Sequence, residues 1–279
     1  MIAVPSLPQA LETGLRNQED DWGDSRVHVS DLAVAIGEKC ARQLWLRLQG
    51  AKKKDLTAGQ LLMFDHAHRI HERLVEVIRE NLNGGWQIQA VEKQVSIGDV
   101  TGRYDTRLWH DGEGWEIIVD FKTMRGRAFG YFKDAKPAHV LQVQAYVTAA
   151  DADAGLLFYV DREGQNAARQ FFVERDDARV FTALRHTLDI AKGPDPGILA
   201  PKVEVRQNKG PDSVYLKQPW NCDYCEYIDV SCPGALPKKM RELGIVGKIN
   251  GSSFTPAKGV PQAVEAVVLE HLEIEEIPF

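Results

Sequence analysis

The sequence predicts an α/β fold, in which helices cover a β-sheet. Residues 102–122 are predicted to form two neighbouring strands, because the glycine-containing turn 111–114 between them is typical of a β-hairpin. Residues 59–82 carry apolar or histidine side chains at three- and four-residue steps, which is the stripe of an amphipathic helix. The other periodic segments predict strands at 86–97, 155–161 and 168–174 and helices at 137–150 and 176–191. A sheet flanked by helices follows from this order of elements.

The composition is that of an ordinary globular protein. The chain has 279 residues, 44% of them hydrophobic and 27% charged, which suits one large domain or two small ones. No stretch is apolar enough to span a membrane, and the N-terminus lacks the features of a signal peptide. We therefore expect a cytoplasmic protein without a membrane partner, whose four cysteines are metal ligands or thiols. The net charge of −6 counts mildly against a nucleic-acid partner, although basic residues can gather in local patches.

The chain before the hairpin is expected to contain a loose segment, two helices and a strand. Residues 1–26 are mixed and polar and are expected to be loose. A first helix is expected from the N-cap Ser30 to near Gly50, with Cys40 inside it. In the strand that precedes the hairpin, Glu92 is either an extra site carboxylate or an exposed strand residue, and we favour the exposed residue.

The hairpin carries the residues that are most able to bind a metal ion or take part in catalysis. Strand side chains alternate between faces, so Asp120 and Lys122 point to one face. If Asp105 on the other strand faces the same way, two carboxylates and one ammonium group converge on a small volume. Two such oxygen ligands suit Mg²⁺ or Mn²⁺, and a lysine beside the ion can hold a water or a phosphate. The alternative is a surface salt bridge on an exposed strand edge.

These residues resemble the motifs of the PD-(D/E)XK nuclease superfamily. The match consists of Asp105, fourteen intervening residues, and then Asp120, Phe121 and Lys122. The run Asp-Phe-Lys-Thr is similar to the RecB-type branch, where Asp replaces the more usual Glu of the second motif. The resemblance implies a restriction-endonuclease-like core with a mixed central sheet flanked by helices. It also implies that Asp105 and Asp120 bind Mg²⁺ or Mn²⁺, with the Phe121 carbonyl as a further ligand, and that Lys122 is catalytic.

His71 lies in the middle of the apolar stripe of the predicted second helix. A histidine there is usually a core residue with a backbone partner. In the RecB-like nucleases, however, the helix before the strands carries a His-Glu pair whose His completes the metal shell, and His71 with Glu72 resembles that pair. The resemblance therefore implies that His71 binds the metal ion, although Ala67 stands where the family usually has Gly. His66 and His68 are weaker candidates.

Basic and aromatic residues interleave in residues 123–133, directly after the hairpin. Arginines can meet phosphates and aromatic rings can stack on bases, as in a groove for single-stranded nucleic acid. This pattern indicates four DNA-binding residues, namely Arg125, Arg127, Tyr131 and Lys133. The alternative is a loop whose aromatic residues fold back onto the core.

The helix predicted at 137–150 carries Gln142 and Tyr146 on one face, because they are four residues apart. The pair resembles the Q-x-x-x-Y motif that follows the lysine strand in RecB-like nucleases. In those enzymes the motif lies beside the scissile strand and helps to position it. The resemblance therefore implies that Gln142 and Tyr146 belong to the catalytic set.

The cysteines form a second motif, C-x2-C-x6-C at Cys222, Cys225 and Cys232, with Cys40 far upstream. Four thiolates suit either a structural zinc ion or an iron–sulfur cluster, and spacing alone favours zinc. The distribution on both sides of a nuclease core resembles the iron–sulfur RecB-like nucleases. These include the bacterial AddB nuclease domain and the CRISPR-associated protein four exonucleases. The resemblance implies a 4Fe–4S cluster that joins the N- and C-terminal parts of the domain.

The resemblance covers residues 27–233, which we expect to be the nuclease domain, while 234–279 form a C-terminal extension of unassigned role. Within the domain, residues 194–219 are rich in Pro, Gly and Asp and are expected to be loop. The resemblance implies a metal-dependent exonuclease that acts on DNA ends or single-stranded DNA. Its setting would be recombination, repair, replication or CRISPR adaptation, with helicase, recombination or CRISPR partner proteins. The alternative is a non-catalytic iron–sulfur DNA-binding or assembly subunit, which a broken metal shell would favour.

Overall fold

The chain forms two compact units, seen in a computed structural model. The structure describes residues 13, 26–164, 168–206, 212–236, 238–241, 245–250 and 253–274. Nearly all of the N-terminal segment predicted to be loose, residues 1–26, lies outside the described residues. Unit 1 comprises Met1–Gly50 and Asp55–Pro196, and unit 2 comprises Ala51–Lys54 and Gly197–Phe279. None of the described helices is long and apolar enough to cross a membrane.

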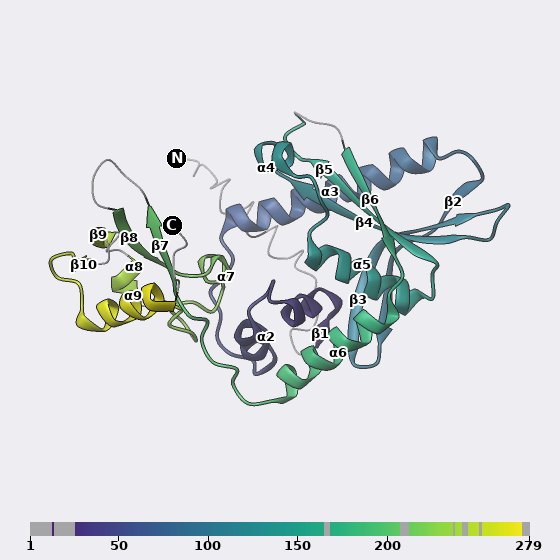
Figure 1. Ribbon diagram of the computed structural model, residues 1–279. Helices are drawn as coiled ribbons and strands as arrows, with labels where there is room; N and C mark the ends of the chain where they lie inside the picture. The colour runs from purple at the N-terminus through teal and green to yellow at the C-terminus, as the bar shows by residue number, and fades with distance from the viewer. Residues whose placement is uncertain are drawn as a thin grey trace, which may run out of the picture. The chain divides into compact units, whose positions relative to one another are not determined.

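Unit 1 is built around a six-stranded sheet (Figure 1). The strand order is β1-β3-β4-β5-β6, and β2 also pairs with β3. The strands are β1 (Val27–His28), β2 (Trp86–Ile97), β3 (Val100–His110), β4 (Glu116–Met124), β5 (Ala154–Asp161) and β6 (Ala168–Glu174). The pairs β1–β3 and β4–β5 are parallel, and the pairs β2–β3, β3–β4 and β5–β6 are antiparallel. The predicted mixed sheet is therefore confirmed.

The helices of unit 1 include the three that periodicity predicted, each within one residue of the expected bounds. Unit 1 contains the 3₁₀ helix η1 (Val29–Ile36), α2 (Ala41–Leu48), α3 (Ala58–Asn81), α4 (Gly126–Tyr131), α5 (Pro137–Ala150) and α6 (Asp177–Lys192). Thr57 caps α3, because its hydroxyl accepts the Gln60 N–H at 3.3 Å while Gln60 Oε1 accepts the Thr57 N–H at 2.9 Å. Pro137 begins α5, where its missing N–H costs no hydrogen bond.

Helices α3 and α5 cover opposite faces of the sheet. Ile118 of β4 belongs to the apolar cluster that contains Leu141 of α5. Its neighbour Val119 belongs to a second cluster with Phe121 and with Val75 of α3. Because side chains alternate along a strand, the two clusters lie on the two faces. The site residues of β4 therefore lie between α3 on one face of the sheet and α5 on the other.

The single helix expected over residues 30–50 is divided, which corrects the prediction. Helix η1 ends at Gly37, whose φ of 74° is left-handed and favours glycine. Helix α2 then begins with Cys40 as its N-cap, so Cys40 does not lie inside a helix. Asp31 of η1 is buried and forms an ion pair with Arg47 of α2. The two short helices are therefore joined by a buried charge pair that the sequence pattern did not reveal.

Unit 2 combines a four-stranded antiparallel sheet with helices. The strand order is β10-β9-β8-β7. The elements are β7 (Lys202–Arg206), β8 (Asp212–Lys217), α7 (Trp220–Asp223), α8 (Lys238–Arg241), β9 (Ile245–Asn250), β10 (Ser253–Pro256) and α9 (Gln262–Ile274). Val214 and Leu216 of β8 form one core with Val264 and Val268 of α9. The expectation of loop at 194–219 agrees with residues 194–201 and 218–219 but was wrong for β7 and β8. Pro, Gly and Asp suggested loop there, whereas Val214 and Leu216 of β8 are buried in the core of the unit.

Helix α5 approaches the sheet closely at Gly155 of β5. A Cβ at this position would lie 2.1 Å from Val143 Cγ1 and 3.2 Å from Val147 Cγ2. The absence of a side chain at Gly155 therefore sets the depth at which α5 packs, and with it the position of Gln142 and Tyr146.

We predict that Gly155→Ala lowers the free energy of unfolding by about 1–3 kcal/mol, because the added methyl group overpacks a filled core. Denaturant titration measures this change. The matched control is Gly59→Ala in α3, where a Cβ meets nothing within 4 Å and alanine favours the helix by about 1 kcal/mol. Equal losses in the two variants would show that the contact with Val143 does not limit the packing.

Candidate active site

Three carboxylates stand side by side on three neighbouring strands. Thr106 of β3 lies opposite Val91 of β2 and opposite Val119 of β4 in the two antiparallel registers. The next residues in one common direction along the sheet are Asp105 on β3, Glu92 on β2 and Asp120 on β4. Glu92 and Asp105 lie on paired strands, where cross-strand neighbours are about 5 Å apart at Cβ, so their side chains interact. The strand registers, and not a loop, bring the carboxylates together.

Strands β3 and β4 separate at this point. Their pairing ends at Thr106 and Val119, whereas β4 continues beside β5 as far as Met124. Asp105 Oδ2 accepts the Phe121 N–H at 2.5 Å, so a side chain supplies the acceptor that the ladder no longer offers. The Asp105 carboxylate is thus held at the opening between the two strands.

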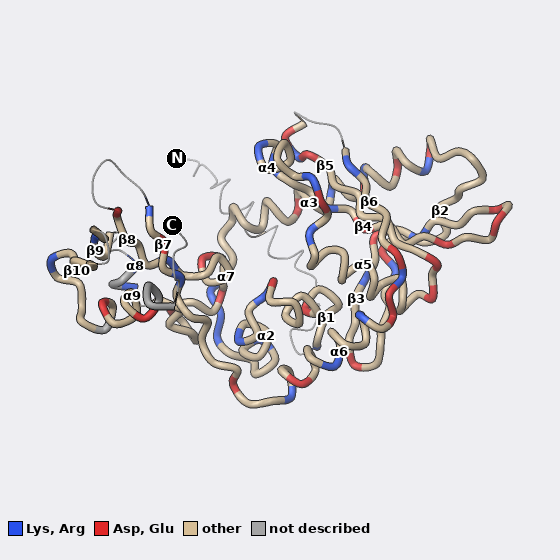
Figure 2. The backbone as a smooth tube through the Cα atoms, viewed as in Figure 1, with Lys and Arg blue, Asp and Glu red and all other residues tan. Residues whose placement is uncertain are grey.

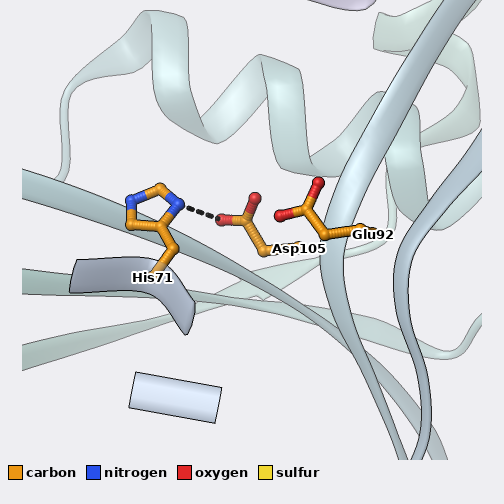
Figure 3. A group of neighbouring side chains, drawn as sticks. All are labelled: His71, Glu92 and Asp105. Atoms are coloured by element: carbon orange, nitrogen blue, oxygen red, sulfur yellow. Dashed lines mark ion pairs between the residues drawn. The ribbon is translucent and has the colours of Figure 1, made fainter. Parts of the chain in front are cut away.

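His71 reaches the same opening from α3. Its Nδ1 lies 3.7 Å from Asp105 Oδ2 (Figure 3). Its ring also meets the Phe121 ring edge-on, at 5.8 Å between centroids. Burial, together with the smaller effect of the nearby Lys122 charge, lowers the pKa of His71 to about 4. The imidazole is therefore neutral at pH 7, which is the form that binds metal ions.

Glu92 also belongs to the site. Figure 3 shows its carboxylate directed toward that of Asp105. In the part of the chain that the structure describes, His71, Glu92 and Asp105 form the one group of three potential ligands whose donor atoms all lie within 4.8 Å of one another. The preference for an exposed strand residue at Glu92 is corrected. The turn at Gly98 and Asp99 could have revealed it, since the register that this turn sets puts Glu92 opposite Asp105.

Asp120 is buried, and Asp105 beside it is largely buried. Burial raises the pKa of Asp105 well above its ordinary value, and the charge of Asp120 raises it further. Burial also raises the pKa of Asp120, which is 2% exposed, while Lys122 Nζ at 2.8 Å opposes that shift. Two neighbouring carboxylates with one ammonium group, 2.8 Å from Asp120, fit a divalent cation, whose preferred ligands they are.

Lys122 connects the carboxylates to helix α5. Its Nζ donates to Gln142 Oε1 at 3.2 Å, and Gln142 Nε2 donates to the Tyr146 hydroxyl at 3.1 Å. Burial raises the pKa of Tyr146, so the phenol stays protonated and can keep accepting this bond. The structure therefore brings the five residues predicted to be catalytic into one connected site, in the order Asp105, Asp120, Lys122, Gln142 and Tyr146.

The comparison with protein families agrees with this geometry. The family model of the PD-(D/E)XK nuclease superfamily matches residues 27–233. The chain belongs to the PD-(D/E)XK nuclease superfamily. The match spans all of the site strands and the three clustered cysteines, and so crosses from unit 1 into unit 2. The chain has no match among curated proteins.

Solved structures with related folds share little sequence with this superfamily member. The protein SSO0001 is 19% identical, with a TM-score of 0.49, over 82% of this chain and 95% of that chain. The alkaline exonuclease LHK-Exo from Laribacter hongkongensis is 15% identical, with a TM-score of 0.42, over 60% of this chain and 86% of that chain. A phage-related exonuclease from Haemophilus somnus 129PT is 15% identical, with a TM-score of 0.46, over 60% of this chain and 92% of that chain.

Two site residues of this superfamily member escaped the sequence analysis. His139 Nδ1 lies 2.8 Å from the Tyr159 hydroxyl, and Tyr159 is the β5 residue directly beside Lys122. Burial lowers the pKa of His139 to about 3, and the charge of Lys122 contributes. Burial raises the pKa of Tyr159 to about 12. Both groups are therefore uncharged beside the Lys122 ammonium. The sequence could have revealed His139, because it precedes Gln142 by about one turn of the predicted helix.

The segment predicted to contact DNA is partly helical. The four residues proposed to bind DNA, Arg125, Arg127, Tyr131 and Lys133, are all exposed, with Tyr131 82% exposed. Figure 2 shows blue positions at the α4 corner of the unit. Phe129 is instead buried and Phe132 packs against Tyr159. The alternative of a loop that folds back onto the core therefore holds for two of the aromatic rings, while DNA binding by the four exposed residues stays a prediction.

The cysteines lie in both units. Cys40 belongs to unit 1, and Cys222, Cys225 and Cys232 belong to unit 2. None of the four forms a disulfide. The loop that carries the three clustered cysteines is held tightly, because the Tyr227 carbonyl accepts the N–H groups of Val230, Ser231 and Cys232. The short segment Ala51–Lys54 is tied to this loop, with the Lys54 N–H donating to Glu226 O at 2.8 Å and Ser231 Oγ donating to Lys52 O at 2.6 Å.

We predict that Asp105→Asn stabilises the metal-free protein at neutral pH. A carboxyl group whose pKa is higher in the folded than in the unfolded chain weakens the fold as pH rises. That penalty is absent below the unfolded pKa near 4 and complete above the folded pKa. The stability gained by the variant should therefore be largest at pH 8 and should shrink toward pH 5.

Unfolding in the presence of a chelator, measured between pH 5 and pH 8, tests this prediction. The matched control is Asp99→Asn, which removes an exposed carboxylate paired with Lys192 at 3.1 Å. It should change stability by less than about 1 kcal/mol. A loss of stability in Asp105→Asn at every pH would mean that the carboxylate supports the fold in its charged form.

Proposed function

We propose that this protein is a Mg²⁺- or Mn²⁺-dependent deoxyribonuclease that hydrolyses phosphodiester bonds, acting as an exonuclease on DNA ends or single-stranded DNA. The observation that supports it most is the proximity of the buried Asp120 and the largely buried Asp105 where β3 and β4 separate, with the Lys122 ammonium 2.8 Å from Asp120. Two carboxylates whose charges oppose each other are unfavourable in a catalytically inactive scaffold. Membership of a nuclease superfamily supports phosphodiester hydrolysis as the reaction at this site.

The metal would be held by Asp105, Asp120 and His71, with the Phe121 carbonyl as a further ligand. A divalent ion at that place supplies an acidified water and neutralises charge on the phosphate. Lys122 holds the attacking water or a phosphate oxygen, and its ammonium favours the charge that develops there. Gln142 fixes the direction of Lys122 through its 3.2 Å hydrogen bond, and Tyr146 fixes Gln142 in turn. The exposed Arg125, Arg127, Tyr131 and Lys133 bind the DNA outside the site.

An assay on end-labelled single- and double-stranded DNA, with and without Mn²⁺, tests the function. Asp105→Ala, Asp120→Ala and Lys122→Ala should each lower kcat by about two to three orders of magnitude, as for other essential electrostatic groups. The exposed residues Asp99 and Lys192 provide matched controls, since alanine at either position removes the same charge far from the site.

Wild-type rates in the Asp120→Ala variant would refute the assignment of the active site. DNA binding without any cleavage by the wild-type protein would favour the alternative function, a non-catalytic DNA-binding or assembly subunit.

We further propose that Cys40, Cys222, Cys225 and Cys232 bind a 4Fe–4S cluster. The donor set suits it, because four thiols without disulfides are available and three of them lie in one tightly bonded loop. The segment Ala51–Lys54, which follows Cys40 closely in sequence, is bonded to that loop. A cluster shared between cysteines so far apart in sequence would close a long loop of chain and stabilise the protein strongly.

We predict that the protein is brown when purified without oxygen, with broad visible absorption that bleaches on reduction. Serine at Cys40 or Cys225 should remove the colour and lower the melting temperature, and nuclease activity should fall in parallel with the folded fraction. A colourless protein that contains one zinc ion per chain would contradict the cluster and leave the nuclease site untouched.

A further inference from the structure

Arg103 and Glu92 form an ion pair at the edge of the candidate active site. Arg103 precedes Asp105 by two residues on β3, and its Nε lies 2.6 Å from Glu92 Oε2. The two side chains are 31% and 30% exposed, so the pair is accessible to solvent and to a ligand. An ion pair with this exposure contributes little to stability, about 0–1 kcal/mol, which makes a purely structural role weak.

The backbone of Glu92 is unusual for a strand. Its φ is 49°, in the left-handed region that side chains other than glycine adopt rarely, although Val91 and Lys93 on both sides are paired with β3. Such a conformation costs on the order of 1 kcal/mol and persists where the surrounding structure requires it. Here it accompanies a carboxylate directed at Asp105, within 4.8 Å of the donor atoms of Asp105 and His71.

The charges around the three carboxylates are unevenly distributed. Lys122 compensates Asp120 at 2.8 Å, and Arg103 compensates Glu92 at 2.6 Å. Asp105 accepts the Phe121 N–H and has the His71 ring, 3.7 Å away at Nδ1, where the other two carboxylates have a lysine or an arginine. A divalent cation drawn to Asp105 therefore meets the Glu92 carboxylate at short range and competes with the Arg103 guanidinium for it. The guanidinium that is displaced matches a phosphate, because its planar fork donates two parallel hydrogen bonds.

We propose that Glu92 is a ligand of the metal ion together with His71 and Asp105, and that it exchanges its ion pair with Arg103 for the ion, which frees Arg103 to bind a DNA phosphate. This inference rests on the proposed nuclease function and deepens it. It links metal binding to DNA binding, because the bound metal ion releases the phosphate-binding Arg103 next to the site.

Calorimetric titration of the full-length, anaerobically purified protein with Mn²⁺ in the absence of DNA provides the first test. Glu92→Gln should weaken Mn²⁺ binding by about ten- to a hundredfold, as the loss of groups around bound metals does. Arg103→Gln should bind Mn²⁺ as tightly as the wild type or more tightly, because a competitor for Glu92 is gone. In cleavage assays at saturating Mn²⁺, Arg103→Gln should raise KM for DNA about tenfold or more.

The matched control is Glu116→Gln. Glu116 pairs with Arg107 across β3 and β4, so the variant removes a Glu–Arg pair on the same sheet away from the metal ligands. It should bind Mn²⁺ and DNA like the wild type, and it reports any general effect of breaking such a pair.

The outcomes separate this inference from the function on which it rests. If Glu92→Gln binds Mn²⁺ like the wild type while Asp120→Asn does not, Glu92 only partners Arg103 and the inference fails alone. If Arg103→Gln loses Mn²⁺ affinity, the exchange is refuted, because Arg103 then supports the metal site. If the wild-type protein itself binds no Mn²⁺, the proposed function and this inference fail together.

Discussion

The register of β3 with its two neighbours is the constraint on which the candidate site depends. It puts Glu92, Asp105 and Asp120 abreast on three adjacent strands, close enough for their charges to act on one another. Like charges at such spacing, in partly buried surroundings, oppose folding unless a cation joins them. The three carboxylates therefore repel one another at this place in the sheet. Lys122, Arg103 and a bound metal ion are the groups that can offset this repulsion.

The rest of unit 1 holds this arrangement from both faces of the sheet. Helix α3 presents His71 from the face where Val75 packs against Val119 and Phe121. Helix α5, which packs closely because Gly155 has no side chain, presents Gln142 to the Lys122 ammonium from the opposite face. The site is thus built from residues of regular elements, whose positions are set by packing and strand pairing, and regular elements hold a site more precisely than loops do.

Local patterns predicted the parts of the site that depend on local geometry. Alternation on one strand and a short turn were enough to associate Asp105, Asp120 and Lys122, and helical spacing was enough to associate Gln142 with Tyr146. Glu92 required the register of a second hairpin, and Arg103 became relevant only through Glu92. In unit 2, composition suggested loop where burial of Val214 and Leu216 against α9 makes strands. A helix was expected to continue through Gly37, where a left-handed residue and the Asp31–Arg47 pair divide it.

The central claim is that the adjoining carboxylates of β2, β3 and β4 hold a catalytic divalent ion. The most direct measurement is anomalous diffraction from crystals of the protein grown with Mn²⁺. The account predicts a manganese peak within about 2.3 Å of oxygens of both Asp105 and Asp120, with His71 Nδ1 or Nε2 turned toward it. A manganese ion bound elsewhere in the chain, with Asp105 and Asp120 still facing only Phe121 and Lys122, would contradict it.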